Sequence, residues 1–192
     1  MDSNAVIDAI KARRNVRGFR LDKPVSKDLV REVLDSAIWA PNHHLTEPWR
    51  FLVIAGDERK KLGEVMAEAR EANSADAPEP QERLDRERAK PLTAPVIIAL
   101  VSCPKQVKQI VPQEEIVAAG AALQNMLLAA HSLGLGTKLV TGLHAYSGRV
   151  RQFLEMKDSE SLVCLVYLGY PDGEPQQGKR TGFDDKVSWR GM

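Results

Sequence analysis

The sequence lacks several features that mark common functional classes. It has only two cysteines in 192 residues, Cys103 and Cys164, without CxxC spacing, so neither a disulfide framework nor a cysteine-rich zinc site is expected. Both lie in or just after apolar, strand-like runs, which favours free buried thiols. The 27 Lys and Arg nearly cancel the 26 Asp and Glu, and the aromatic residues are scattered. We therefore expect no nucleic-acid partner.

Long apolar runs are also missing. The most apolar long segment starts at Ile116 and is interrupted by Gln124, Asn125 and His131, which makes it too polar for a membrane span. The N-terminus has no basic region followed by an apolar one. We expect a cytoplasmic protein with no membrane partner. Its length and its 43% hydrophobic and 28% charged composition favour a single domain, residues 1–192.

Motifs for side-chain catalysis are absent too. We find no nucleophile elbow, phosphate loop or metal triad. Gly134-Leu135-Gly136 follows a helical pattern and lacks a third glycine, so it is not a dinucleotide fingerprint. The adjacent His43 and His44 should diverge in an extended loop, and no metal site is expected there. We assign no catalytic side chain. Local anion sites at both ends of the chain, with a Trp/Pro loop and a Gly-rich turn between them, better fit a bound redox cofactor that brings its own reactivity.

A basic stretch near the start is the most informative feature present. Arg13, Arg14 and Arg17 lie within five positions, after a segment with apolar residues at helical spacing, so a helix should end near Arg14. Guanidinium groups at a helix end suit a ligand that carries phosphate. From this stretch alone, a solvated basic helix end is the preferred explanation.

The rest of the chain alternates between helices and strands without an internal repeat, which indicates a layered α+β or α/β domain. Apolar patterns and capping residues predict helices over 26–40, 57–72, 113–133 and 147–155, and strands over 50–55, 94–102, 137–141 and 162–169. Residues 73–90 are expected to form an exposed excursion, and residues 171–192 a C-terminal arm. The small residues of the long helix would suit either the core or a subunit interface.

Taken together, these motifs resemble the nitroreductase family of FMN-dependent oxidoreductases over nearly the whole chain. The resemblance is carried by five segments in the family's order: Arg13-Arg14-Asn15-Val16-Arg17-Gly18-Phe19, Ala40-Pro41 with Glu47-Pro48-Trp49-Arg50-Phe51, the long helix into Gly134-Leu135-Gly136, Leu168-Gly169-Tyr170-Pro171, and Arg180 with Asp184-Asp185-Lys186-Val187-Ser188-Trp189.

The resemblance implies an α+β, three-layer α/β/α fold with a central mixed, mainly antiparallel sheet. It also implies an intertwined homodimer with FMN at the subunit interface. Matched by position, the phosphate and ribityl chain of FMN would be held by Arg13, Arg14, Asn15, Arg17 and Arg180. Asn15 stands where the family more often has Ser, and Lys179 is a further candidate. The backbone of Leu139, Val140 and Thr141 would face the flavin ring, although Val140 fits a plain buried strand equally well.

One segment departs from the family pattern. Family members commonly have Asn and Gln before Pro-Trp, where this chain has Leu45 and Glu47. The Ala-Pro-Asn-His sequence instead resembles a compact subgroup in which the histidine approaches FMN from the partner subunit. This resemblance makes His43 a cofactor-binding candidate, against the alternative of an ordinary loop histidine. Glu47 is expected to point away from the flavin, because a reduced ring is anionic.

The function implied is reduction of nitroaromatic or quinone-type acceptors by NADPH or NADH through a ping-pong mechanism. The acceptor would be a small molecule. Two alternatives stay open: specialised flavin chemistry, such as dehalogenation, desaturation or flavin breakdown, and a flavin-binding module without activity.

Overall fold

The computed structural model describes residues 4–74, 78–105, 110–142 and 145–191. A four-stranded sheet lies at its centre in the order β1-β2-β4-β3. The strands are β1 (Trp49–Ala55), β2 (Val96–Ser102), β3 (Gly136–Val140) and β4 (Ser161–Gly169). All three strand pairs are antiparallel, and a single parallel bridge joins Asn15 to Thr137 beside β3. The mixed, mainly antiparallel sheet expected from the sequence is confirmed.

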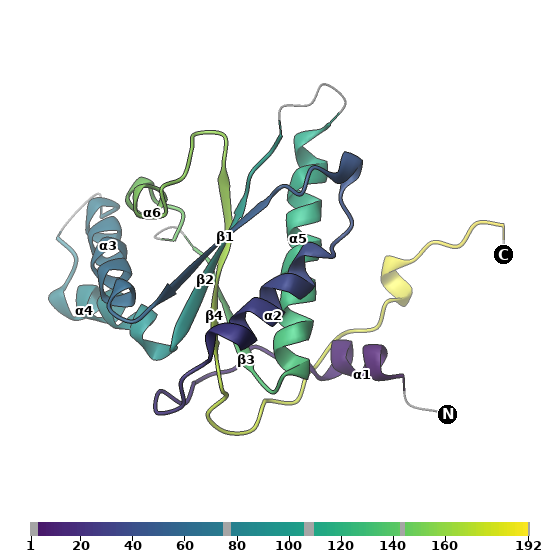
Figure 1. The fold of residues 1–192 in the computed structure, drawn as a ribbon, viewed down its shortest axis with the longest axis horizontal. Coiled ribbons are helices and arrows are strands. Elements are labelled where there is room, and N and C mark those ends of the chain that lie inside the picture. The colour runs from purple at the N-terminus through teal and green to yellow at the C-terminus, as the bar shows by residue number, and fades with distance from the viewer. Residues whose placement is uncertain (1–3, 75–77, 106–109, 143–144, 192) are drawn as a thin grey trace.

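Helices cover both faces of the sheet, as expected for three layers (Figure 1). One face carries α2 (Lys27–Ile38) and α5 (Pro112–Ser132), and the other carries α3 (Glu58–Ala72) and α6 (Gly148–Phe153). Alternate residues of β2 supply the two faces: Ile98 packs toward α2 and α5, whereas Ile97 and Ala99 pack toward α3 and α6. Every residue of β2 is buried, in agreement with its unbroken apolar sequence.

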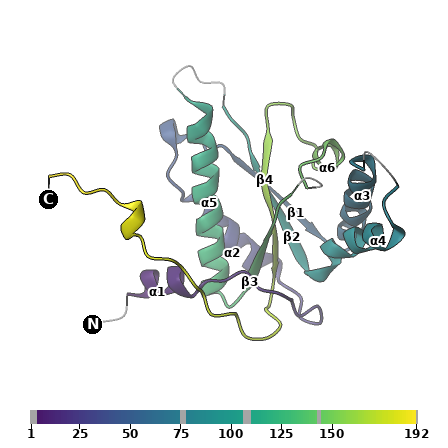
Figure 2. The ribbon, with the colours of Figure 1, turned by 180° about the vertical axis from the view of Figure 1, so that it is seen from behind.

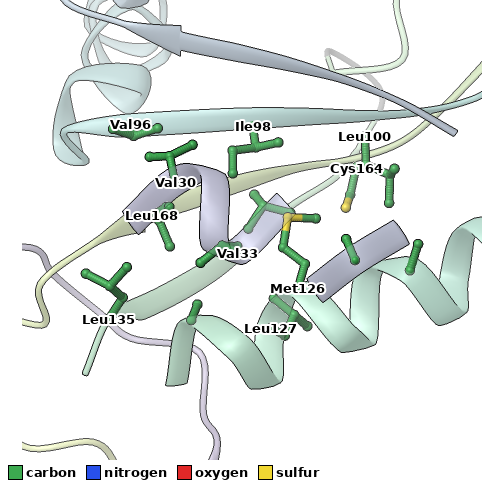
Figure 3. Close-up of a cluster of buried hydrophobic side chains, with 14 of the residues drawn as sticks. Val30, Val33, Val96, Ile98, Leu100, Met126, Leu127, Leu135, Cys164 and Leu168 are labelled. Carbon is green, nitrogen blue, oxygen red and sulfur yellow. The ribbon is translucent and has the colours of Figure 1, made fainter. Parts of the chain in front are cut away.

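The core between the sheet and α5 is assembled from small and branched side chains. Figure 3 shows Met126 and Leu127 of α5 near Val33 of α2, below β2 and β4. Leu135 lies in the same cluster, just after α5. The cluster fixes the C-terminal end of α5 against the start of β3. As a result, the Gly134-Leu135-Gly136 turn is held at the end of the sheet where β3 begins.

Side-chain caps define where three of the helices begin. The Asn4 carboxamide accepts hydrogen bonds from Val6 and Ile7 N–H groups at the start of α1 (Ala5–Ala12). Ser26 caps α2 through Leu29 N–H, and Ser147 caps α6 in the same way. These polar residues satisfy N–H groups that have no partner within the helix. These capping residues explain why the starts of these three helices could be predicted from the sequence.

Residues 81–89, within the segment expected to be an exposed excursion, are mostly exposed but pack against the body of the domain as a helix. They form α4 (Gln81–Ala89), followed by the 3₁₀ turn η2 (Lys90–Thr93), and α4 packs against α3. Leu84 is buried, and the carboxylate of Glu87 is buried and pairs with Arg70 at 3.0 Å and Lys90 at 2.5 Å. The sequence did not predict this packing, because charged residues that form buried pairs cannot be distinguished in the sequence from charged residues on a solvated surface.

The contact between α3 and α4 leaves no room for a side chain at Gly63. A Cβ there would overlap the backbone carbonyl oxygen of Arg88. We therefore expect Gly63→Ala to lower the free energy of unfolding by about 1–3 kcal/mol, as overpacking does in cores. Urea denaturation at fixed protein concentration measures this. Gly148→Ala is the control, because a Cβ at Gly148 meets nothing within 4 Å. Equal stability of the two variants would show that α4 is not closely packed on α3.

The C-terminal arm, residues 171–191, leaves the body beside α1 and runs outward (Figures 1 and 2). It contains one short 3₁₀ turn, η3 (Asp184–Lys186). Its large apolar side chains are open to solvent, with Phe183 65% and Trp189 68% exposed. In the parts of the chain that the structure describes, no helix is both long enough and apolar enough to cross a membrane.

Candidate functional site

The arginine stretch lies between the end of α1 and the outer side of β3. Helix α1 stops at Ala12, and Arg13 turns the chain into an extended path. Val16 N–H then donates to the carbonyl of Thr137 at 2.9 Å. An added Cβ at Gly136 would lie 2.7 Å from Val16 Cγ1, so glycine is what lets the two segments approach. The position of the arginines is therefore fixed by a helix end and by a close contact with β3.

Three guanidinium groups come together here from both ends of the chain. Burial, followed by the charges of Arg14 and Arg180, holds the pKa of Arg13 below its ordinary value. Arg14 lies against Gly178 so closely that a Cβ at Gly178 would overlap its guanidinium. Arg14 Nη1 donates to the carbonyls of Lys11 and of Arg13, the latter at 2.7 Å. Like charges gathered with no acidic partner among the described residues favour an anionic ligand.

Two of these guanidiniums have unused donors. The Nε atoms of Arg13 and Arg14 are buried and have no hydrogen-bond partner in the described part of the chain. Buried polar groups are normally satisfied, so an unpaired donor beside two further cations is an unusual arrangement. A phosphate group would supply both the acceptor oxygens and the negative charge that these arginines lack. The residues present thus fit the phosphate end of FMN.

Two hollows adjoin the arginines. A cavity of about 200 Å³ is lined by Arg13, Arg14, Val16, His131, Gly136 and Thr137, among others. A second hollow of about 350 Å³ is lined by Ile10, Lys11, Arg14, Gly178 and Arg180. Arg14 lines both hollows, so the group formed by Arg13, Arg14 and Arg180 lies between them. His131, in the last turn of α5, had not been singled out from the sequence, where it read only as a polar interruption of an apolar helix.

The remaining cofactor-binding candidates are Asn15 and Arg17, next to these arginines in the sequence, and residues 139–141, at the end of β3. Asn15 and Arg17 are exposed. Leu139 packs with the cluster on the α5 side and Val140 with the cluster on the α3 side, while Thr141 is exposed. Because a strand rises about 3.3 Å per residue, β3 carries the chain roughly 13 Å from Thr137 to Thr141. The strand thus leads from the arginine group toward the far end of the sheet.

His43 lies away from the arginines in the same chain. Its Nδ1 is 2.9 Å from Glu114 Oε2, at the start of α5, whereas the arginines face His131 and Gly134 at the other end of that helix. The 21 residues of α5 span about 30 Å at 1.5 Å per residue. A single chain therefore does not bring His43 and Arg13 to one small ligand.

The loop around His43 has an unusual backbone. His44, Leu45 and Glu47 all have left-handed φ angles, of 53°, 53° and 46°, a region that is costly for residues other than glycine. The expectation that His43 and His44 diverge was wrong: the short 3₁₀ turn η1 (His43–Leu45) stacks their rings with centroids 4.2 Å apart. Stacking is possible because His44 leaves the extended conformation. Among the described residues, no group of three or more His, Cys, Asp or Glu is placed to hold a metal ion.

Comparison with known proteins agrees with this fold. The family model described as the nitroreductase family matches residues 10–170. The chain is 29% identical over 182 residues to the candidate NAD(P)H nitroreductase YfhC of Bacillus subtilis, covering 94% of this chain and 92% of that protein.

Two solved structures are similar over almost their full length. One is a nitroreductase-like family protein from Bacillus cereus, 29% identical, with a TM-score of 0.82 and coverage of 100% of this chain and 99% of that one. The other is a candidate nitroreductase from Desulfovibrio desulfuricans in complex with FMN, 27% identical, with a TM-score of 0.73 and the same coverage. The family model spans most of the chain and the fold agrees with it; this protein belongs to the nitroreductase family.

Proposed function

We propose that this protein is an FMN-dependent oxidoreductase that uses NADPH or NADH to reduce nitroaromatic or quinone-type acceptors. The observation that carries the proposal is the group formed by Arg13, Arg14 and Arg180, in which two buried Nε donors have no partner in the described residues. The FMN-bound relative and the NAD(P)H nitroreductase name of another support the same cofactor and donor. The cytoplasmic location expected from the sequence is part of this proposal.

Each candidate residue has a role in binding rather than in proton transfer. Arg13, Arg14 and Arg180 would hold the phosphate of FMN, and Asn15 and Arg17 would reach its ribityl chain. The backbone of residues 139–141 would face the ring. When bound, FMN supplies hydride acceptance and release, and the protein supplies position and electrostatics. This division of labour explains why no catalytic dyad is found in the sequence.

The site is completed by a second copy of the chain. His43 is about one length of α5 away from the arginines, so it would contribute to the FMN site of the partner subunit. The outward face of α5 is apolar, with Ile116 54% and Val117 70% exposed. Exposed apolar surface of this kind marks an interface. We therefore propose a homodimer in which each site takes residues from both chains.

The test is a visible spectrum of the purified protein, followed by anaerobic addition of NADPH and then NADH. We expect a yellow flavin spectrum that bleaches with at least one nucleotide. Initial rates with a nitroaromatic or a quinone should give parallel lines, because nucleotide and acceptor take turns in one pocket. A colourless protein that FMN does not reconstitute would overturn the cofactor proposal. Bleaching followed by intersecting lines would overturn only the shared pocket.

A further inference from the structure

The loop that carries His43 is held by the first turn of α5 at two neighbouring residues. His43 Nδ1 lies 2.9 Å from Glu114 Oε2. Three residues further along the loop, Thr46 Oγ1 donates to Glu115 Oε1 at 2.7 Å. Glu115 is 1% exposed, and its other oxygen accepts a hydrogen bond from Lys105 N–H at 2.9 Å. Consecutive glutamates thus fasten the loop to the helix, one through an imidazole and the other through a hydroxyl.

Glu114 is itself fixed in place as an ionised acceptor. Its Oε2 accepts Val111 N–H at 3.2 Å, where α5 begins, and a helix N-terminus favours negative charge. The hydrogen bond from His43, followed by that from Val111, holds the pKa of Glu114 below its ordinary value. An ionised carboxylate has no proton to donate. The shared hydrogen bond with His43 must therefore use a proton carried by the histidine.

This constraint selects one form of the ring. We propose that Glu114 is a positioning residue that holds neutral His43 as the Nδ1–H tautomer and leaves Nε2 as the ring nitrogen available to a bound ligand. One face of the ring is covered by His44, which stacks on it with centroids 4.2 Å apart. A carboxylate that orients a histidine through one nitrogen sets the role of the other.

The consequence for the ligand rests on the function proposed above, in which His43 reaches the FMN site of the partner. There, Nε2 would present a lone pair in the neutral ring, or a proton in the charged ring. His43 and Glu114 also line an open groove of about 460 Å³, together with Pro41, Asn42 and Val117. The groove lies beside the outward face of α5, so a partner subunit packed on α5 would meet this histidine.

The first test reads the tautomer directly and does not depend on FMN. Nitrogen NMR of the labelled protein distinguishes protonated from unprotonated ring nitrogens, and His43→Gln identifies the His43 signals. We expect Nδ1–H in the wild type and a shift toward Nε2–H in Glu114→Ala. Glu114→Gln should give an intermediate result, because its amide can still accept while its charge is gone. Glu82→Gln, which removes an exposed carboxylate paired with Arg86 on α4, should leave the His43 signals unchanged.

The second test asks whether the tautomer matters to the reaction. In FMN-loaded protein we expect Glu114→Gln to lower kcat/KM for the acceptor by about tenfold, a loss typical of residues that orient a functional histidine, with FMN affinity retained. Unchanged His43 signals in Glu114→Ala would overturn the proposal. A shifted tautomer with unchanged kcat/KM would overturn the positioning role. A shifted tautomer in a protein that binds no FMN would uphold the tautomer assignment and overturn the function proposed above.

Discussion

Replacing Arg180 with alanine is expected to weaken FMN binding roughly 10- to 150-fold, corresponding to a charge-assisted contact of about 1.5–3 kcal/mol. The same change should not destabilise the FMN-free protein and should slightly stabilise it. The opposite signs arise because Arg180 stands near Arg13 and Arg14, and each cation disfavours the others when no anion is present. Arg13→Ala should weaken FMN binding by a similar factor.

Two measurements separate the effects. Fluorescence titration gives the FMN dissociation constant, and urea denaturation of FMN-free protein gives the free energy of unfolding. Arg86→Ala is a matched control: it removes the same charge from the exposed surface of α4, in the opposite layer. If Arg180→Ala keeps full FMN affinity, the three-arginine site is wrong. If affinity and FMN-free stability fall together, Arg180 acts by anchoring the arm.

Placing a carboxylate at position 117 should dissociate the homodimer proposed above. Val117 is 70% exposed on α5, while the neighbouring Ala118 and Ala119 are buried in the core. Desolvating an unpaired charge in an apolar interface costs at least about 2 kcal/mol, so Val117→Asp should raise the dimer dissociation constant at least about 30-fold. FMN retention should fall as well, because each proposed site needs His43 from the second chain.

Analytical ultracentrifugation over a range of concentrations measures the association, and the ratio of flavin to protein absorbance measures retention. Leu21→Asp is the control, since Leu21 is also a largely exposed apolar residue, at 60%, but lies in a turn outside α5. It should stay dimeric and yellow. A Val117→Asp protein with the wild-type dissociation constant would exclude this face of α5 from the interface.

Much of the fold was predictable because local signals and tertiary structure agree. The sequence offers Ser3 or Asn4, Ser26, Asp57 and Ser147 as helix caps, and the structure shows Asn4, Ser26 and Ser147 in that role, whereas Asp57 forms no side-chain cap hydrogen bond. The unbroken apolar run of β2 correctly indicated a strand covered on both faces. The packing of α4 was not predictable in this way. Glu87 looks solvated until Arg70, seventeen residues away in sequence, is seen to pair with it, so helix α4 could not be inferred from composition alone.

The candidate site was predictable only where its residues lie close together in the sequence. Arg13 and Arg14 stand out as a local cluster, but only the family resemblance suggested that Arg180 joins them across the length of the chain. Glu114 gave no signal, because an acidic residue in the first turn of a helix is ordinary, and its partner His43 lies 71 positions earlier. The left-handed backbone at His44, Leu45 and Glu47 was likewise hidden, since this conformation is uncommon for any residue other than glycine.

The two edge strands of the sheet differ in how their outer sides are covered, and this affects the risk of aggregation of a newly made chain. On its outer side β3 carries an isolated bridge from Asn15 to Thr137, whereas the outer side of β1 has no strand against it in the described residues. Its Phe-Leu-Val-Ile centre, with Val53 47% exposed, offers unpaired backbone groups on an apolar ribbon, which is a template for aggregation. Left uncovered, this edge would therefore allow backbone pairing with other chains, a risk that the outer side of β3 presents less, because Asn15 bridges to it.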